Sequence, residues 1–405
     1  MRSLRKLFRI LLAVQGAFVT GARILEQDKE VEVFIRRRKD ASPRCSRCRK
    51  KLRGKIVTRK GRWRHFDLMD WKCYLVGEVR EGYCRTHGRR VERIPWAYPA
   101  ARHTKMFDRK VARMAQVTDK SAVMEFFRMT WRTVGRIVKR IVADVLPKDL
   151  FNDLDVIGVD EVSYKRGHRY LTVVSDLISE RVIWVHEGKS AEVLGEFFKA
   201  LGEKRSHQLS VVAMDMSEAY QKAVKAYAPQ AQIVYDRFHV IKLLLEAVDE
   251  TRRDECRKAR GKARDALKGT RFALLRNPKH QAPGDIEKIR HVESSNRRLT
   301  RAYGLRVDFE DLWEIEDESK ARRFIMRWTR AALKSRLPHM RRFARTVRNH
   351  LDGILGFFKY YGTTNAFLEG TNNKIRLLIH RAYGFRSVPA LMAMIHLCCS
   401  GIRLS

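Results

Sequence analysis

The sequence is short of acidic residues. Its 405 residues include 46 Asp and Glu against 85 Lys and Arg, which gives a formal net charge of +39 at pH 7. A protein this basic needs a polyanionic partner, because its charges otherwise repel one another. The basic residues accompany Trp-containing segments that can fold rather than one tail, which favours nucleic acid over a membrane surface or a merely solvated surface.

Long apolar runs are also missing. No segment approaches ~20 consecutive apolar residues, so we expect no membrane span. Residues 7–19 are apolar after a basic start, but Arg9 and Gln15 interrupt them, which favours an amphipathic or strand-forming segment over a signal peptide. The seven cysteines are an odd number in a long chain and do not suit a secreted disulfide framework. We therefore expect a cytoplasmic protein.

The cysteines that are present include two close pairs. Cys45-x-x-Cys48 and Cys84-x-x-His87 each have the spacing of a metal-binding knuckle. Three thiolates and one imidazole suit tetrahedral Zn²⁺, and hairpin-like segments can fill the long stretch between the pairs. Unrelated buried cysteines are the alternative, and Cys73 is an alternative ligand without a partner nearby. The other cysteines are expected to be small core residues: Cys256, Cys398 and Cys399.

A three-helix segment follows the cysteine module. Residues 107–117 and 121–127 predict two helices, and residues 131–142 predict a third after a short turn. The third helix is expected to expose four cations: Arg132, Arg136, Lys139 and Arg140. Such a helix can enter a major groove as the recognition helix of a helix-turn-helix. Any three-helix packing has a similar pattern, and it is the charge that favours DNA.

From residue 154 the apolar period becomes that of strands. The predicted elements are strands 154–159, 170–174 and 181–185, helix 190–203, strand 209–214, a helix after Ser217, and strand 232–235. The first three strands predict an antiparallel meander, and the whole order is that of a ribonuclease-H-like fold. Residues 240–360 show no strand signal and predict an Arg- and Lys-rich helical insertion with Trp313 and Trp328 in its core. Residues 363–400 predict two helices around a turn at Gly384.

Two aspartates stand directly after buried strands. Asp160 follows residues 156–159, and Asp215 follows residues 211–214. Open α/β sheets place ligands at these carboxyl ends, so the two side chains can share a metal if their strands are neighbours. A lone aspartate after a strand is more often a cap or a solvated strand end.

A third acid, Glu369, lies on a predicted helix. Helical spacing places it on one face with four polar residues: Asn365, Asn372, Asn373 and Arg376. Apolar residues on the opposite side, such as Leu368 and Ile375, predict the core-facing side. A carboxylate beside side-chain amides and an arginine can bind a metal ion and a phosphate. Three carboxylates can hold two Mg²⁺ or Mn²⁺ ions for phosphodiester cleavage, because such ions prefer hard oxygen ligands.

Further charged residues each have two possible interpretations. His239, three residues after Asp236, is either a satisfied buried histidine or a residue that orders Asp236 or binds the scissile phosphate. A cationic run is too charged for a core and is either a solvated helix or a phosphate contact. The run begins with Arg252, Arg253, Arg257 and Lys258.

Several motifs occur in order along the chain: Gly158-Val159-Asp160-Glu161, Asp215-Met216-Ser217, Asp236-Arg237-Phe238-His239, Glu369-Gly370-x-Asn372-Asn373-Lys374 and Tyr383-Gly384-Phe385-Arg386. Together they resemble the DDE transposases of bacterial insertion sequences, ISL-three family, from about residue 40 to the end. The resemblance implies that Asp160, Asp215 and Glu369 are the metal-binding triad, with the Asp236–His239 pair near the cleavage site.

The sequence and this resemblance imply a multidomain α+β protein. Its expected parts are a lead-in (1–40), a zinc-binding domain (41–97), a helix-turn-helix DNA-binding domain (98–148), a ribonuclease-H-like α/β catalytic core (149–250 and 361–405) and an all-helical insertion (251–360). We expect two Mg²⁺ or Mn²⁺, one structural Zn²⁺, and metal-dependent cleavage and strand transfer at the terminal inverted repeats of an insertion sequence. The expected partners are these double-stranded ends, target DNA and a second subunit, in the bacterial cytoplasm at the nucleoid. A catalytically silent transposase-derived regulator and a ribonuclease-H-like nuclease are the alternatives.

Overall fold

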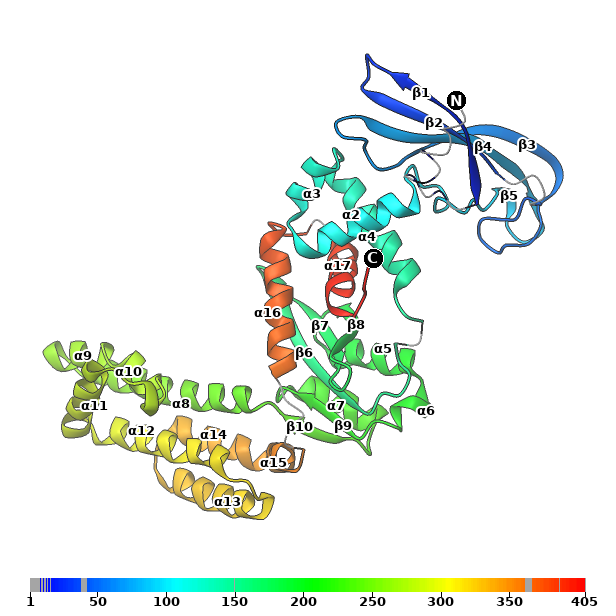
Figure 1. Ribbon diagram of the computed structural model, residues 1–405. Helices are drawn as coiled ribbons and strands as arrows, with labels where there is room; N and C mark the ends of the chain where they lie inside the picture. Colours follow the sequence, from blue (N-terminus) through cyan, green and yellow to red (C-terminus); the bar gives the residue numbers. More distant parts are fainter. Residues whose placement is uncertain are drawn as a thin grey trace. The chain divides into compact units, whose positions relative to one another are not determined.

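The computed structural model describes residues 8, 10, 12, 14, 16–37, 42–148, 150–360, 366–385 and 387–404 (Figure 1). Asn365 and Arg386, named above, lie outside the described residues. The chain divides into two compact units. Unit 1 comprises residues 1–146 and 385–405, and unit 2 comprises residues 147–384.

Unit 1 contains a five-stranded sheet. Its strands are β1 (Ala17–Leu25), β2 (Glu30–Arg37), β3 (Arg53–Arg64), β4 (Lys72–Cys84) and β5 (Gly88–Val91). Their order is β1-β2-β4-β3, and β5 pairs with the end of β4. β3 and β4 form the hairpin expected between the cysteine pairs. Residues 17–37 belong to this sheet rather than only leading into it, because Val33 and Ile35 of β2 share a core with Leu75 of β4.

Four helices form the second part of unit 1. They are α2 (Lys105–Val117), α3 (Lys120–Phe126), α4 (Trp131–Val145) and α17 (Val388–Cys399). The first three confirm the predicted helices, and each begins after a capping side chain: Thr104, Asp119 and Thr130. α17 packs on α2 and α4, where the Gln116 side chain donates to the Leu397 carbonyl at 2.7 Å. The chain thus returns to unit 1 after Gly384, although the sequence grouped residues 361–405 together.

Unit 2 is built on a second five-stranded sheet. Its strands are β6 (Val156–Lys165), β7 (Arg169–Asp176), β8 (Arg181–Glu187), β9 (Val211–Met214) and β10 (Gln232–Tyr235). Their order is β10-β9-β6-β7-β8. β6, β7 and β8 form the predicted antiparallel meander, whereas β9 pairs in parallel with both β6 and β10. The first and fourth predicted strands are therefore neighbours.

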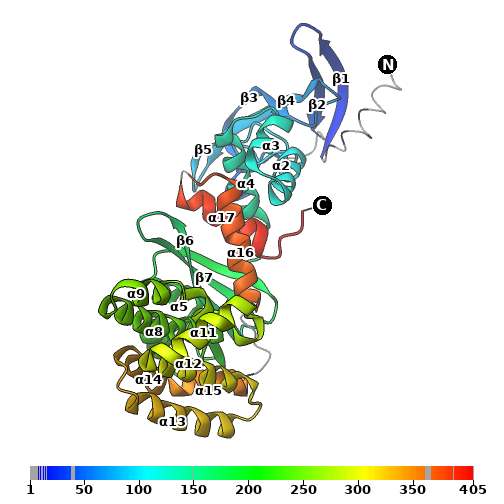
Figure 2. The ribbon, with the colours of Figure 1, turned by 90° about the vertical axis from the view of Figure 1, so that its left-hand side faces the viewer.

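Helices cover both faces of the unit 2 sheet. α5 (Ala191–Leu201) and α7 (Glu218–Tyr227) share the core of the face that carries Ile157 and Val159, and the short α6 (Glu203–Ser206) follows α5. α16 (Ala366–Arg381) lies along β6 in Figures 1 and 2. It covers the other face, since successive strand residues alternate in direction. A Cβ atom on Gly158 would lie 2.7 Å from Leu368, so glycine at this position lets the helix approach.

The described residues between β10 and α16 are helical, as the sequence predicts. The helices of this segment are α8 (Arg237–Lys258), α9 (Gly261–Lys268), α10 (Arg271–Leu275), α11 (Pro283–Ser295), α12 (Arg297–Glu310), α13 (Glu318–Lys334), α14 (Pro338–Asn349) and α15 (Leu351–Lys359), with 3₁₀ turns η1 (Pro278–His280) and η2 (Asp311–Glu314). Trp313 and Trp328 lie in its core, as expected, with 7% and 4% of their surface exposed. α15 returns to the sheet, where Gly353 approaches Tyr235. No helix of the described segments combines the length and apolar character that a bilayer span requires.

Candidate functional site

Three neighbouring strands of unit 2 carry an aspartate at the point where their parallel pairing stops. Asp215 and Asp236 directly follow β9 and β10, whereas Asp160 lies within β6, which continues to Lys165 beside β7. The expected strand end at residue 159 was therefore wrong, because antiparallel pairing with β7 prolongs the strand. β9 pairs in parallel with β6 and β10, and Met214 marks the same register on both sides. Asp160, Asp215 and Asp236 are the next residues along β6, β9 and β10. They form a row across one edge of the sheet, about 4.8 Å from strand to strand. The predicted neighbourhood of Asp160 and Asp215 therefore follows from strand register.

Two donors orient Asp160. The backbone N–H of Glu161 donates to Oδ1 at 2.7 Å, and the side-chain amide of Asn372 donates to Oδ2. Asn372 is 6% exposed and lies on the buried side of α16 with Leu368 and Ile375. The predicted helix face was wrong here, because it grouped Asn372 with exposed residues. The signal was in the sequence, since Asn372 stands four residues after Leu368 and three before Ile375.

The other polar residues of that face that the structure describes are exposed. They are Glu369, Asn373 and Arg376. Arg376 Nη1 donates to Asn373 Oδ1 at 3.0 Å. Glu369 lies three residues before Asn372, which is about 4.5 Å along the helix axis from the residue that binds Asp160.

The three predicted acids are not gathered into one tight ligand set. Within the described ranges, the groups of three or more Cys, His, Asp or Glu ligands whose atoms lie within 4.8 Å of one another do not include Glu369. Two ions about 3.5–4 Å apart keep their flanking ligands farther apart than this.

The electrostatics of this edge favour bound cations. Burial raises the pKa of Asp160 and the nearby charge of Asp215 adds to the rise, while its two donors and His239 oppose it. His239 is partly buried, and its Nδ1 lies 2.9 Å from Asp236 Oδ2. This hydrogen bond raises the pKa of His239, and the charges of Asp160 and Asp215 reinforce the effect. His239 is therefore a partner of Asp236 rather than an isolated buried histidine.

A second cluster lies in unit 1. Cys45, Cys48, Cys84 and His87 each offer one ligand atom, and these atoms lie within 4.8 Å of one another. The Sγ atoms of Cys48 and Cys84 are 3.5 Å apart. His87 Nδ1 is 3.7 Å from Cys84 Sγ and 3.9 Å from Cys45 Sγ. Four tetrahedral bonds of about 2.3 Å place ligand atoms about 3.8 Å apart, so this set fits Zn²⁺.

The other cysteines lie apart from this cluster. Cys73 is buried in the core of the unit 1 sheet, and this burial raises its pKa to about 12. Cys256 and Cys399 are buried and Cys398 is half-buried, in line with the expected core positions. By contrast, burial of Cys84 is outweighed by hydrogen bonds from His87 and nearby backbone, which lower its pKa to about 6. A low thiol pKa favours the thiolate that a metal binds.

The predicted recognition helix α4 has three exposed cations and one paired cation. Arg132, Arg136 and Lys139 are exposed. Arg140 is half-buried, and its Nη1 lies 3.4 Å from Oδ2 of the fully buried Asp108. The expected exposure of Arg140 was therefore wrong, because a buried carboxylate draws a counter-charge to itself.

The four cations of the run named above lie on α8 and pair with acids on the same helix. Arg252 is 8% exposed, with Nη2 2.7 Å from Asp249 Oδ1. The expectation that this run is too cationic for a core was wrong at Arg252, since Asp249 compensates its charge. The exposed Arg253, Arg257 and Lys258 also pair with acids three or four residues earlier. Less positive charge is free on α8 than its composition indicates.

Comparisons with known proteins bear on both units. Residues 157–395 match a family model for ISL3 transposases with a DDE domain, described as "Transposase". Residues 92–142 match the helix-turn-helix domain of transposase family ISL3. The transposase for insertion sequence element IS1557 from two Mycobacterium tuberculosis strains is 35% identical, over 100% of this chain and 97% of the relative. The transposase for IS1001 from Bordetella parapertussis is 31% identical, over 84% of this chain and 85% of the relative.

Proposed function

Because the chain belongs to transposase family ISL3, we propose that Asp160, Asp215 and Glu369 bind two Mg²⁺ or Mn²⁺ ions and cut and join DNA at the ends of an insertion sequence. The observation that carries this proposal is that Asp160 and Asp215 directly follow the last parallel pair of β6 and β9, while Asn372 of α16, the helix that bears Glu369, donates a hydrogen bond to Asp160. The oxygen donors suit hard cations. When bound, such ions stabilise charge on the attacking and leaving oxygens of a phosphodiester.

Neighbouring residues would position the DNA strand. His239 holds a proton more readily than a free histidine, because Asp236 accepts from it, so it can bind the scissile phosphate. Arg376 and Asn373 are exposed on α16 one to two turns beyond Glu369 and can hold a second phosphate. The protein would contribute chiefly by positioning, which is a large share of catalysis in phosphoryl transfer.

The remaining domains of the chain have roles in the same proposal. The mixed sheet of unit 2, three antiparallel strands followed by two parallel ones, supports a ribonuclease-H-like core interrupted by residues 251–360. Cys45, Cys48, Cys84 and His87 would hold a structural Zn²⁺. The exposed cations of α4 would read the terminal inverted repeats in a major groove, with the exposed cations of α8 on phosphates. A homodimer would join the two ends.

The carboxylates can be tested one at a time. Asp160→Asn, Asp215→Asn and Glu369→Gln should each lower Mg²⁺-dependent strand cleavage by about 10³-fold, since a bound metal supplies several kcal/mol. Binding to inverted-repeat DNA should stay near the wild-type value. Glu203→Gln, an exposed acid of the same unit, is the control. Excision by any of the three variants at the wild-type rate would exclude that residue as a metal ligand.

The two alternatives predict other outcomes. If the protein is a silent regulator, the wild-type chain would bind the element ends but would give no strand transfer with Mg²⁺. A nuclease for hybrids would bind an RNA–DNA duplex more tightly than inverted-repeat DNA. One binding and one strand-transfer assay on the wild-type chain separate these functions.

A further inference from the structure

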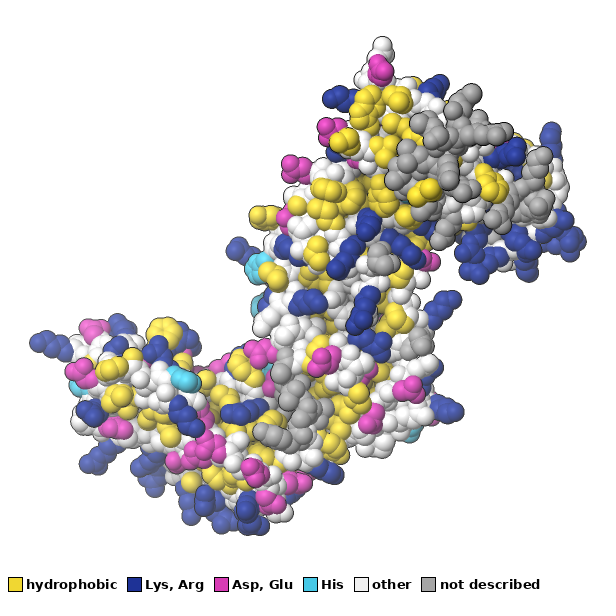
Figure 3. Space-filling view, viewed as in Figure 1, with side chains coloured by type: hydrophobic (Ala, Val, Ile, Leu, Met, Phe, Trp, Pro, Cys, Tyr) yellow, Lys and Arg dark blue, Asp and Glu magenta, His cyan; other side chains and the backbone are white. Residues whose placement is uncertain are grey.

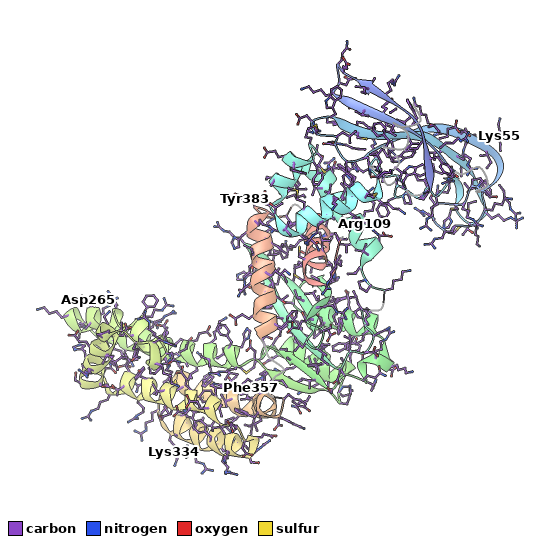
Figure 4. All side chains as sticks on the ribbon, viewed as in Figure 1. Lys55, Arg109, Asp265, Lys334, Phe357 and Tyr383 are labelled. Carbon is purple, nitrogen blue, oxygen red and sulfur yellow. The ribbon has the colours of Figure 1, made fainter. Side chains whose placement is uncertain are left out.

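The end of the unit 1 sheet beside the cysteine–histidine cluster is strongly basic. Residues 41–66 contain many Lys and Arg but no Asp or Glu. Seven of these cations are exposed around the first knuckle and the start of β3: Arg44, Arg47, Arg49, Lys50, Lys51, Arg53 and Lys55. Figure 3 shows Lys and Arg side chains gathered over this part of unit 1, and Figure 4 labels Lys55 on β3. Such a density of one charge attracts a polyanion.

Three side chains form a row across this end of the sheet. Tyr83 of β4 is paired on one side with Arg53 of β3 and on the other with Arg89 of β5. Residues directly opposite in antiparallel strands share a face, with Cβ atoms about 4.5–5.5 Å apart. Tyr83 is 57% exposed, and both arginines are exposed. We call these residues the Arg–Tyr–Arg row.

Ion pairs leave most of the charge of this row uncompensated. Within the described residues Arg53 has no ion pair, and Arg89 Nε lies 2.8 Å from Glu81 Oε1. The same Glu81 also pairs with Arg59, at 3.1 Å. The guanidinium groups of Arg59 and Arg89 therefore share one carboxylate while Arg53 has none, and the face keeps a net positive charge.

The Arg–Tyr–Arg row adjoins the cysteine–histidine cluster. Tyr83 immediately precedes Cys84, and Arg89 follows His87 by two residues, so two ligands of the cluster flank the row. Arginine presents a planar fork of donors that matches a phosphate. A backbone that strand pairing already holds in place loses less entropy on binding than a free loop. An exposed tyrosine between two such forks can lie against a sugar edge or a base.

We propose that the Arg–Tyr–Arg row binds the phosphate backbone of duplex DNA, independently of base sequence and separately from α4. The inference rests on the proposed function, because the duplex that the row would contact is the DNA at the end of the insertion sequence. The row would supply affinity through release of counterions, while the exposed residues of α4 supply sequence discrimination.

The test uses the full chain and two duplexes, one with the inverted repeat and one unrelated. Arg53→Gln/Arg89→Gln should weaken binding to both duplexes by the same factor. It should also reduce the slope of log K against log salt by about 1.8, since each phosphate contact contributes about 0.9. Tyr83→Ala should weaken binding severalfold without changing the slope. Arg53→Lys/Arg89→Lys keeps the charge and should keep the slope.

Controls separate a lost contact from a lost fold or a lost function. Lys222→Gln/Lys225→Gln removes two exposed cations of α7 in unit 2 and should leave the slope unchanged. Zinc content and circular dichroism equal to wild type identify folded variants. If the wild type binds the repeat and the double Gln variant keeps its affinity and slope, the row is excluded and the proposed function stands. If the wild type binds neither duplex, both the role of the row and the proposed function are excluded.

Discussion

The cysteine–histidine cluster of unit 1 and the aspartate row of unit 2 are built in opposite ways. The cluster draws its ligands from two turns and closes them within 4.8 Å of one another. The aspartate row is set by the register of parallel strands, and the third acid of the proposed triad, Glu369, is exposed on a separate helix. Structural metal sites are closed, whereas catalytic sites keep positions open for substrate. The difference in closure therefore predicts which site holds the fold and which one reacts.

Two acids of the molecule show the same contrast. Asp108 of α2 is fully buried, and among the described residues neither of its oxygens has a hydrogen-bond donor. Burial raises the pKa of Asp108 to about 7, against the opposing charge of Arg140. Asp160 is partly buried and accepts two hydrogen bonds. The first acid costs stability, whereas the second is kept oriented for a ligand.

Removing the closed site should have the largest effect. Cys84→Ser, or a chelator selective for Zn²⁺, should unfold the knuckles and the adjoining sheet, because structural Zn²⁺ contributes about 10–16 kcal/mol. Hydrogen exchange should show loss of protection in β4 and β5, while β6 and β9 keep theirs. Cys73→Ser, a cysteine outside the cluster, should retain one zinc per chain. Full protection of β4 and β5 without zinc would show that the cysteine–histidine cluster does not hold the fold.

Neutralising the buried acid should come next in size. The pKa of Asp108 rises from 3.8 to about 7 on folding, so the folded state keeps a proton that the unfolded chain has lost. Stability from this group is complete below about pH 4 and is lost as pH rises through about 7. Asp108→Asn should therefore stabilise unit 1 at pH 8 by up to about 4 kcal/mol and by less at pH 6, at about 1.4 kcal/mol per pKa unit.

Hydrogen exchange of α2 and α4 at the two pH values measures this effect. Asp28→Asn, at an exposed turn of the same unit, is the matched control and should change neither value. An Asp108→Asn variant that is less stable than wild type at pH 8 would show that the Arg140 pair outweighs the cost of burial.

The smallest expected effect tests how Asp160 is oriented in the proposed catalytic site of unit 2. Asn372→Ala removes one of the two donors to Asp160 without removing an acid. Residues that orient a metal ligand typically contribute 10–100-fold, so cleavage should fall by about that factor. The Mg²⁺ concentration for half-maximal cleavage should rise, which a merely structural role would not produce. Asn373→Ala, its exposed neighbour, should leave that concentration unchanged; equal shifts in the two variants would contradict the role of Asn372.

Local patterns carried much of the prediction. The periods of apolar residues located the three helices of residues 105–145 and all five strands of unit 2, because period reports which side of an element is buried. The Cys-x-x-Cys and Cys-x-x-His pairs identified the cluster, since each pair lies within one turn. Where local pattern and tertiary contact conflict, the prediction failed. Arg140 and Arg252 look like surface cations in sequence, but buried acids draw them inward.

By itself the sequence determined the elements, the two ligand pairs and the positions of Asp160 and Asp215 directly after buried apolar runs, because these depend on residues a few positions apart. Only the tertiary structure decided the contact of Asn372 with Asp160, across 212 residues, and the alignment of Arg53, Tyr83 and Arg89. Such contacts depend on strand register and helix packing. These are set by the burial of whole faces, and no short stretch of sequence contains that information.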